Sequence, residues 1–176
     1  MKRLFAVLLA VMLVASMATV VSAENTTTLT TTVPAATYTL NIPADQEIPF
    51  GVQKTDIGEI SVTNSTGFAD GKNLKVTFTY ADFESASNST TIPFELTMLQ
   101  SEGFSTTSVP DTWKVKSGES IEFTGNTDGT VKETVALGGS GGLCHVGVII
   151  KSSSWGKALA GDYTATITFT AEVVVE

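Results

Sequence analysis

The chain has one cysteine and one histidine, and they are adjacent, as Cys144 and His145. A histidine beside a cysteine can activate the thiolate as a nucleophile. Residues 144–151 alternate like a strand, however, and consecutive side chains of a strand point to opposite faces. Cys144 would then lie on the core face with Val146 and Val148 and behave as a small hydrophobe. We therefore expect a buried structural thiol. A reactive or intermolecular thiol is the alternative, and it requires an exposed Cys144.

Two glycine-containing segments have part of the composition of a phosphate or ion site. Residues 138–142 are Gly-Gly-Ser-Gly-Gly. No Lys-Ser/Thr pair and no helix follow them, so we expect a flexible loop. Residues 126–129 (Asn-Thr-Asp-Gly) match the middle of a calcium loop, but the two anchoring ligand positions fall on Thr124 and Val135. We interpret this segment as a hairpin turn. Neither segment predicts a metal or a cofactor.

The sequence carries no recognisable catalytic set. A Ser–His–Asp triad would have to use His145, and no serine lies in a Gly-x-Ser-x-Gly elbow. The carboxylate pair of a glycoside hydrolase forms only in space, so a secreted hydrolase remains a distant third interpretation. We predict that the protein is not an enzyme and uses no cofactor.

Trp113 and Trp155 are the two tryptophans, and both lie outside the regularly alternating segments. A tryptophan on a loop can stack on a sugar ring or fill a pocket of a partner. The competing interpretation, which we favour, is that each tryptophan caps one end of the core. Both stay candidate ligand contacts.

The elements that must position these residues are strands. Apolar and polar residues alternate with period two, and β-branched threonine is abundant. The pattern predicts an all-β, antiparallel two-sheet β-sandwich of the Ig-like or fimbrial-like kind, with about nine strands. Short helical turns are expected within 80–86 and 153–159. The expected strands cover residues 38–42, 57–63, 74–80, 92–98, 119–124, 130–137, 144–151 and 163–175.

The N-terminus has the features of a signal peptide. Lys2 and Arg3 precede an uncharged apolar run, which ends in the small residues Val-Ser-Ala. We expect residues 1–23 to be removed, leaving no integral membrane segment; an uncleaved membrane anchor is the alternative. Residues 24–36 are a Thr-rich leader or an edge strand, and residues 37–176 are a single β-sandwich domain.

The acidic balance restricts the possible partners. Removing Lys2 and Arg3 takes the formal net charge from −8 to −10. Such a charge argues against general affinity for nucleic acid or anionic lipid. One cysteine also excludes a disulfide framework within the chain.

Four segments resemble, in order, an exported bacterial family. They are residues 38–51 (Tyr-Thr-Leu-Asn-Ile-Pro-Ala-Asp-Gln-Glu-Ile-Pro-Phe-Gly), 58–62, 74–76 and 160–169. Together they resemble the WxL surface proteins of Gram-positive bacteria and, more distantly, fimbrial subunits. The Trp-x-Leu motifs of that family are absent, since Leu-Lys-Val and Phe-Thr-Ala stand at 74–76 and 169–171. The resemblance implies a β-sandwich at the cell surface and assigns no functional residue.

These features predict a secreted, non-catalytic surface protein with a binding, adhesive or structural role at the cell envelope. Its expected partner is an envelope polymer or another surface protein. The alternative is a pilin-like subunit that self-associates by strand addition, using the leader and the strand 162–175. The leader carries only Leu29 and Val33 as large apolar residues, so this alternative ranks second.

Overall fold

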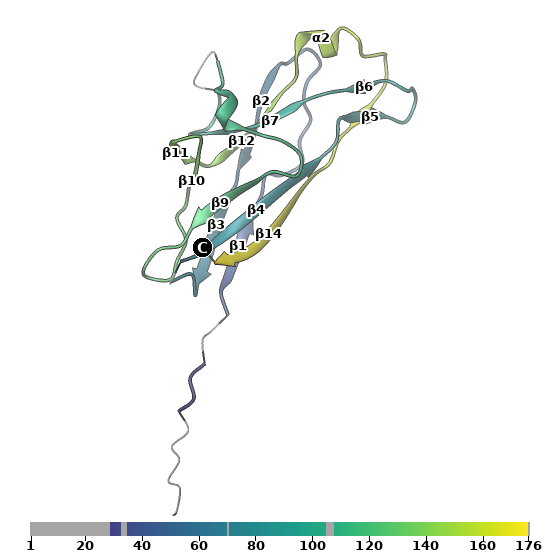
Figure 1. Cartoon of the computed structure of the whole chain (residues 1–176). Helices are drawn as coiled ribbons and strands as arrows, with labels where there is room; N and C mark the ends of the chain where they lie inside the picture. The colour runs from purple at the N-terminus through teal and green to yellow at the C-terminus, as the bar shows by residue number, and fades with distance from the viewer. Residues whose placement is uncertain (1–28, 33–34, 70, 105–107, 176) are drawn as a thin grey trace, which may run out of the picture. The chain divides into compact units, whose positions relative to one another are not determined.

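The computed structural model describes residues 29–32, 35–69, 71–104 and 108–175 (Figure 1). These residues form an all-β, sandwich-like fold of antiparallel sheets, which confirms the fold class predicted from the alternation. The short helices are η1 (Asp111–Trp113) and α2 (Ser152–Trp155). The strands are β1 (Thr37–Asn41), β2 (Lys54–Glu59), β3 (Ser61–Thr66), β4 (Lys72–Tyr80), β5 (Phe83–Ser85), β6 (Thr91–Ile92), β7 (Glu95–Leu99), β8 (Lys114–Val115), β9 (Ser120–Thr124), β10 (Val135–Leu137), β11 (Ser140–Leu143), β12 (His145–Ile149), β13 (Tyr163–Thr164) and β14 (Ile167–Val175).

Two sheets supply most of the pairing. The larger has the order β2-β12-β7-β8, and the second has the order β14-β4-β9. Smaller sheets, β1-β3, β13-β5-β6 and β10-β11, complete the fold. β3 continues from β2 through Ile60, whose N–H donates to the carbonyl of Cys144. In the second sheet β14 has β4 as its neighbour on one side, so β14 is an edge strand.

The core contains side chains from both large sheets. Leu74, Val76 and Phe78 of β4 are fully buried, and Val146 and Val148 of β12 belong to the same hydrophobic cluster. Their spacing of two residues puts each set on one face of its strand. Burying a side chain of this size stabilises the fold by roughly 1.5–3 kcal/mol.

The structure differs from the predicted elements in several places. The strand expected at 57–63 is divided at Ile60 between β2 and β3. The strand expected at 92–98 is interrupted between β6 and β7, where Pro93 has no N–H for a ladder. The strand expected at 163–175 is divided into β13 and β14. The helical turn expected within 80–86 is wrong, because this segment contains β5, whereas the turn expected near 153–159 begins as α2.

Residues 126–129 form the predicted turn. The N–H of Asn126 donates to the carbonyl of Thr130 at 2.8 Å, and Gly129 has a φ of +85°. The flanking chains pair only through the bridge from Gly125 to Val131. The hairpin after β9 is therefore much shorter than the alternation suggests, since β10 pairs with β11 instead.

The glycine-rich segment 138–142 was expected to be a loop, and part of it is a strand. Gly138 and Gly139 form the turn at φ values of +55° and +82°, and β11 begins at the next residue. A Cβ on Gly138 would lie 2.2 Å from the Cβ of Thr112, so this turn also needs glycine for space.

The predicted signal peptide and most of the leader lie outside the described residues. Residues 29–32 are exposed and form no strand, and the side chain of Leu29 is 90% exposed. Residues 34–176 form one compact unit. Within the described ranges, no helix is long and apolar enough to cross a membrane.

Candidate functional site

Two adjoining cavities open along one side of the sandwich. The larger has a volume of about 770 Å³ and the smaller about 380 Å³. Both are lined by Gln46, Ile48 and Phe83, so they form one continuous depression, which we call the edge groove. Volumes of this size are typical of ligand sites.

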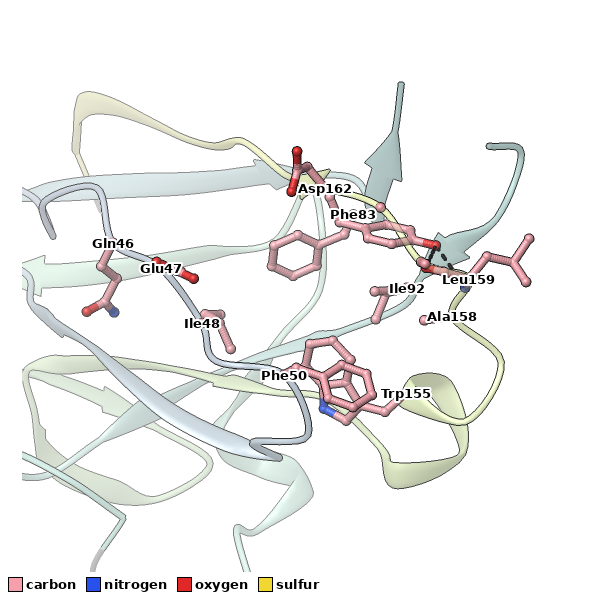
Figure 2. Close-up of a pocket in the computed structure, with 13 residues that line it drawn as sticks. Gln46, Glu47, Ile48, Phe50, Phe83, Ile92, Trp155, Ala158, Leu159 and Asp162 are labelled. Carbon is pink, nitrogen blue, oxygen red and sulfur yellow. Dashed lines mark hydrogen bonds between the residues drawn. The ribbon is translucent and has the colours of Figure 1, made fainter. Parts of the chain in front are cut away.

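One wall of the edge groove is the segment between β1 and β2. Residues 42–46 line the smaller cavity, and residues 46–48 line the larger one. Phe50 ends this wall. The opposite wall is the stretch from α2 to β14, and the floor includes Phe83, Ile92 and Phe94. Figure 2 shows Ile48, Phe83, Ile92 and Trp155 around the larger cavity. The floor combines the half-buried Phe83 with the buried core residues Ile92 and Phe94.

An aromatic pair stands at the mouth of the larger cavity. Phe50 is 81% exposed, and its ring lies edge-on to Trp155 with 5.3 Å between ring centroids (Figure 2). The indole N–H of Trp155 donates to the carbonyl of Val52 at 2.9 Å, which fixes the ring to the opposite wall. Gly51, at a φ of +82°, reverses the chain directly after Phe50. A large apolar side chain is thus held in solvent by a defined turn rather than by a loose loop.

The second wall is anchored through Tyr163. Its hydroxyl accepts a hydrogen bond from the N–H of Leu159 at 3.1 Å and also contacts Thr90 and Asn88 of the neighbouring loop. Leu159 itself is 56% exposed. These contacts hold a second exposed apolar residue at the groove in a fixed position.

The edge groove is acidic at its rim. Asp45, Glu47 and Asp162 line it, whereas no Lys, Arg or His is among the described residues that do so. An apolar floor with an acidic rim favours ligands that combine apolar groups with positive charge.

The two tryptophans have different positions. Trp113 lies in η1 and is buried against the core, with only 9% of its surface exposed, so it offers no surface for a ligand. The core interpretation therefore fits Trp113. Trp155, the other candidate ligand contact from the sequence, lines the edge groove.

Cys144 is half-buried rather than fully buried. β12 begins one residue later, at His145, so Cys144 does not share the burial of Val146. Burial and the nearby carboxylates of Glu59 and Asp56 raise the pKa of the thiol. A raised thiol pKa opposes formation of the reactive thiolate at neutral pH.

His145 contacts a carboxylate, and no contact with the thiol is found in the described part of the chain. Its Nδ1 lies 3.1 Å from Oδ2 of Asp56. Asp56 also accepts hydrogen bonds from the N–H groups of Gly58 (2.8 Å) and Gly103 (2.6 Å). Asp56 therefore ties β2 to β12 and to the loop after β7, which is a structural role. No group of three or more His, Cys, Asp or Glu side chains is placed to hold a metal in the described ranges.

Sequence reasoning missed Phe50, Leu159 and the groove that they border. One signal was available for Phe50, since it stands between Pro49 and Gly51. Proline and glycine on either side make a strand interior unfavourable and a turn favourable, so an aromatic residue between them is expected to be exposed.

Comparison with known proteins returned no match to a family model, a curated protein or a solved structure. The resemblance to WxL proteins and fimbrial subunits therefore rests on the short sequence segments alone.

Proposed function

We propose that this chain is an exported, non-catalytic binding protein of the cell envelope, and that the edge groove holds its ligand. The observation that carries the proposal is the exposure of Phe50. Its side chain is 81% exposed beside Trp155 at the mouth of an apolar cavity. Exposing a phenylalanine is unfavourable in water, and contiguous exposed apolar surface commonly marks an interaction site. Aromatic residues at such positions often dominate the binding energy.

The test is co-sedimentation of the full chain with purified cell envelopes of the producing cells. We expect saturable binding that weakens about tenfold or more in Phe50→Ala, because the exposed aromatic contact at the mouth of the groove is lost. Val175→Ala is the matched control, since Val175 is 71% exposed but lies outside the groove. Equal binding of the two variants, or no binding of the unaltered chain, contradicts the proposal.

The second candidate is a subunit that polymerises by strand addition. It is favoured by the edge position of β14 and by Leu29, which is 90% exposed on the leader. Deleting residues 24–33 should abolish concentration-dependent assemblies in analytical ultracentrifugation if the leader is the donated strand. The same deletion should leave envelope binding unchanged if the edge groove is a ligand site.

A further inference from the structure

The wall of the edge groove contains a strand edge without a neighbouring strand. β14 is nine residues long and pairs with β4 in an unbroken register. In the part of the chain that the structure describes, no strand pairs with its other side. A free edge of this kind is a template for an added strand.

The pairing of β4 shows which groups of β14 face outward. The N–H of Phe78 donates to the carbonyl of Glu119, and its carbonyl accepts from the N–H of Gly118. Both groups of Phe78 therefore point away from β14. Phe169, which stands opposite Phe78, must then be in a non-hydrogen-bonded pair, and its own N–H and C=O point to the free edge.

The outward set continues at every second residue. Ile167 stands opposite Tyr80, whose N–H donates to the hydroxyl of Ser117 on the side away from β14. The same rule assigns the carbonyl of Ala171 to the free edge, and the hydroxyl of Tyr38 indeed donates to it at 3.4 Å. Ala171 is thereby partly covered, whereas Ile167 and Phe169 lie where the groove opens.

The free edge and the apolar groove coincide at these two residues. Ile167 and Phe169 line the smaller cavity with their side chains, opposite residues 42–48. A strand added along this edge would hydrogen-bond to their backbone groups and point every second side chain into the groove. The wall continues through residues 158–163 into the larger cavity, so an extended segment can follow it beyond Ile167.

We propose that the edge groove binds an extended, cationic polypeptide segment of another protein, which adds as a strand to β14 at Ile167 and Phe169. This inference rests on the proposed function, because it names the ligand of the same groove. The apolar floor selects alternating apolar side chains. Asp45, Glu47 and Asp162 select Lys or Arg at the ends of the segment.

The charge of the chain's own leader argues against the leader as the occupant of the groove. Residues 24–36 contain Glu24 and no Lys or Arg, so they offer the acidic rim no cationic side chain. A bound glycan would also leave the outward N–H and C=O groups of β14 without the regular partners that an extended backbone provides.

Synthetic peptides test the proposal on the full chain. The probe is the nine-residue peptide Lys-Thr-Val-Thr-Val-Thr-Val-Thr-Lys. We expect it to bind, and we expect a version with Glu in place of both Lys to bind about tenfold or more weakly. A peptide of the same composition with its three Val residues adjacent should lose a similar factor, because only alternation directs all three side chains into the groove. Every second peptide bond can be N-methylated in two alternative sets. Only the set whose N–H groups face β14 should prevent binding.

Backbone amide resonances provide a readout that a non-specific apolar contact would not reproduce. On adding the Lys-flanked peptide, the N–H groups of Ile167 and Phe169 should shift and exchange with solvent more slowly. Those of Thr168 and Thr170, which face β4, should change little. Uniform changes along β14, or none, overturn the strand-addition proposal.

Proline variants test the edge from the side of the protein. Ile167→Pro removes an outward N–H and should weaken peptide binding more than Ile167→Ala, which keeps it. Val173→Pro removes an equivalent outward N–H outside the groove and should bind like the unaltered chain. Equal binding of Ile167→Pro and Ile167→Ala contradicts the main-chain contact.

The outcomes separate this inference from the proposed function. If Phe50→Ala impairs envelope binding but the Lys-flanked peptide does not bind, the groove holds another ligand and the strand-addition proposal fails alone. If a synthetic peptide of residues 24–36 binds more tightly than the Lys-flanked peptide, the occupant is a second copy of this chain and the cationic partner is rejected. If neither Phe50→Ala nor the peptides have any effect, both proposals fail.

Discussion

At the scale of single residues, position in the fold separates the surroundings of Cys144 from those of His145. The adjacent Cys144 and His145 face different surroundings, because β12 begins between them. His145 is engaged by Asp56, and the thiol lies near carboxylates that disfavour its ionisation. The geometry thus gives His145 a carboxylate neighbour, Asp56, in place of the adjacent thiol.

The Cys144 thiol should react slowly. Its pKa is raised from an ordinary value of 9.0 by burial and by Glu59 and Asp56, so the thiolate fraction at pH 7 is below that of a free cysteine. We expect iodoacetamide to modify the folded chain several-fold more slowly than the urea-unfolded chain. Modification that is as fast in the folded chain would restore the reactive-thiol interpretation.

Gly125 should be intolerant of any side chain. A Cβ there would lie 2.2 Å from the carbonyl oxygen of Lys72 and 2.4 Å from that of Phe68. We expect Gly125→Ala to destabilise the fold by about 3 kcal/mol in urea unfolding, because the backbone must move. Gly141→Ala is the control, since nothing lies within 4 Å of its added Cβ. A change below about 1 kcal/mol at Gly125 would contradict the close approach.

At the scale of elements, ion pairs connect neighbouring strands of the larger sheet. Glu95 of β7 lies 2.9 Å from the ammonium of Lys114 on β8 and 2.8 Å from that of Lys151 after β12. Hydrogen bonds from Lys151 and Lys114 hold the pKa of Glu95 below its ordinary value of 4.5. One carboxylate thus joins three adjacent segments, although it is partly exposed.

Glu95 should stabilise the fold only above acidic pH. Because its pKa is lower in the folded chain than in the unfolded chain, its contribution is complete above about pH 4.5 and is lost as the pH falls through the folded value. We expect Glu95→Gln to cost less than about 1 kcal/mol at pH 7, since pairs at the surface contribute little. In urea unfolding from pH 7 to pH 3, the difference between the two chains should shrink toward acid. A difference that grows toward acid would reverse the assignment.

At the scale of the whole molecule, the free edge of β14 is poorly protected. Many exposed edge strands carry Lys, Pro or a bulge, and β14 has none of these over its nine residues. Val173 and Val175 are also exposed. Such an edge suits a strand-accepting site and also exposes the protein to edge-to-edge association.

A lysine at the edge should suppress this association. We expect Val175→Lys to slow aggregation on heating by several-fold, as measured by light scattering, because a charge at an edge disfavours strand pairing. Thr127→Lys makes the same charge change at an exposed position of the turn 126–129 and should have little effect. Equal effects of both variants would indicate that net charge alone, and not the edge, controls aggregation.

The sequence by itself determined the all-β class and most of the strands, because the period-two spacing of residues such as Leu74, Val76 and Phe78 is a local property of the chain. It did not determine that residues 80–86 would pair as β5 instead of turning as a helix, or that β10 would pair with β11. Those outcomes depend on which neighbours each segment meets.

Apart from Trp155, which the sequence already offered as a ligand contact, the candidate site was decided by the tertiary structure. Phe50, Leu159 and Ile167 are far apart in the chain, and nothing in their local sequence reports that they border one groove. Which backbone groups of β14 face outward follows from the bonds that Phe78 makes on the opposite side. Local spacing specifies which face of a strand is apolar, whereas strand order decides which edge stays free and where the core can be reached from solvent.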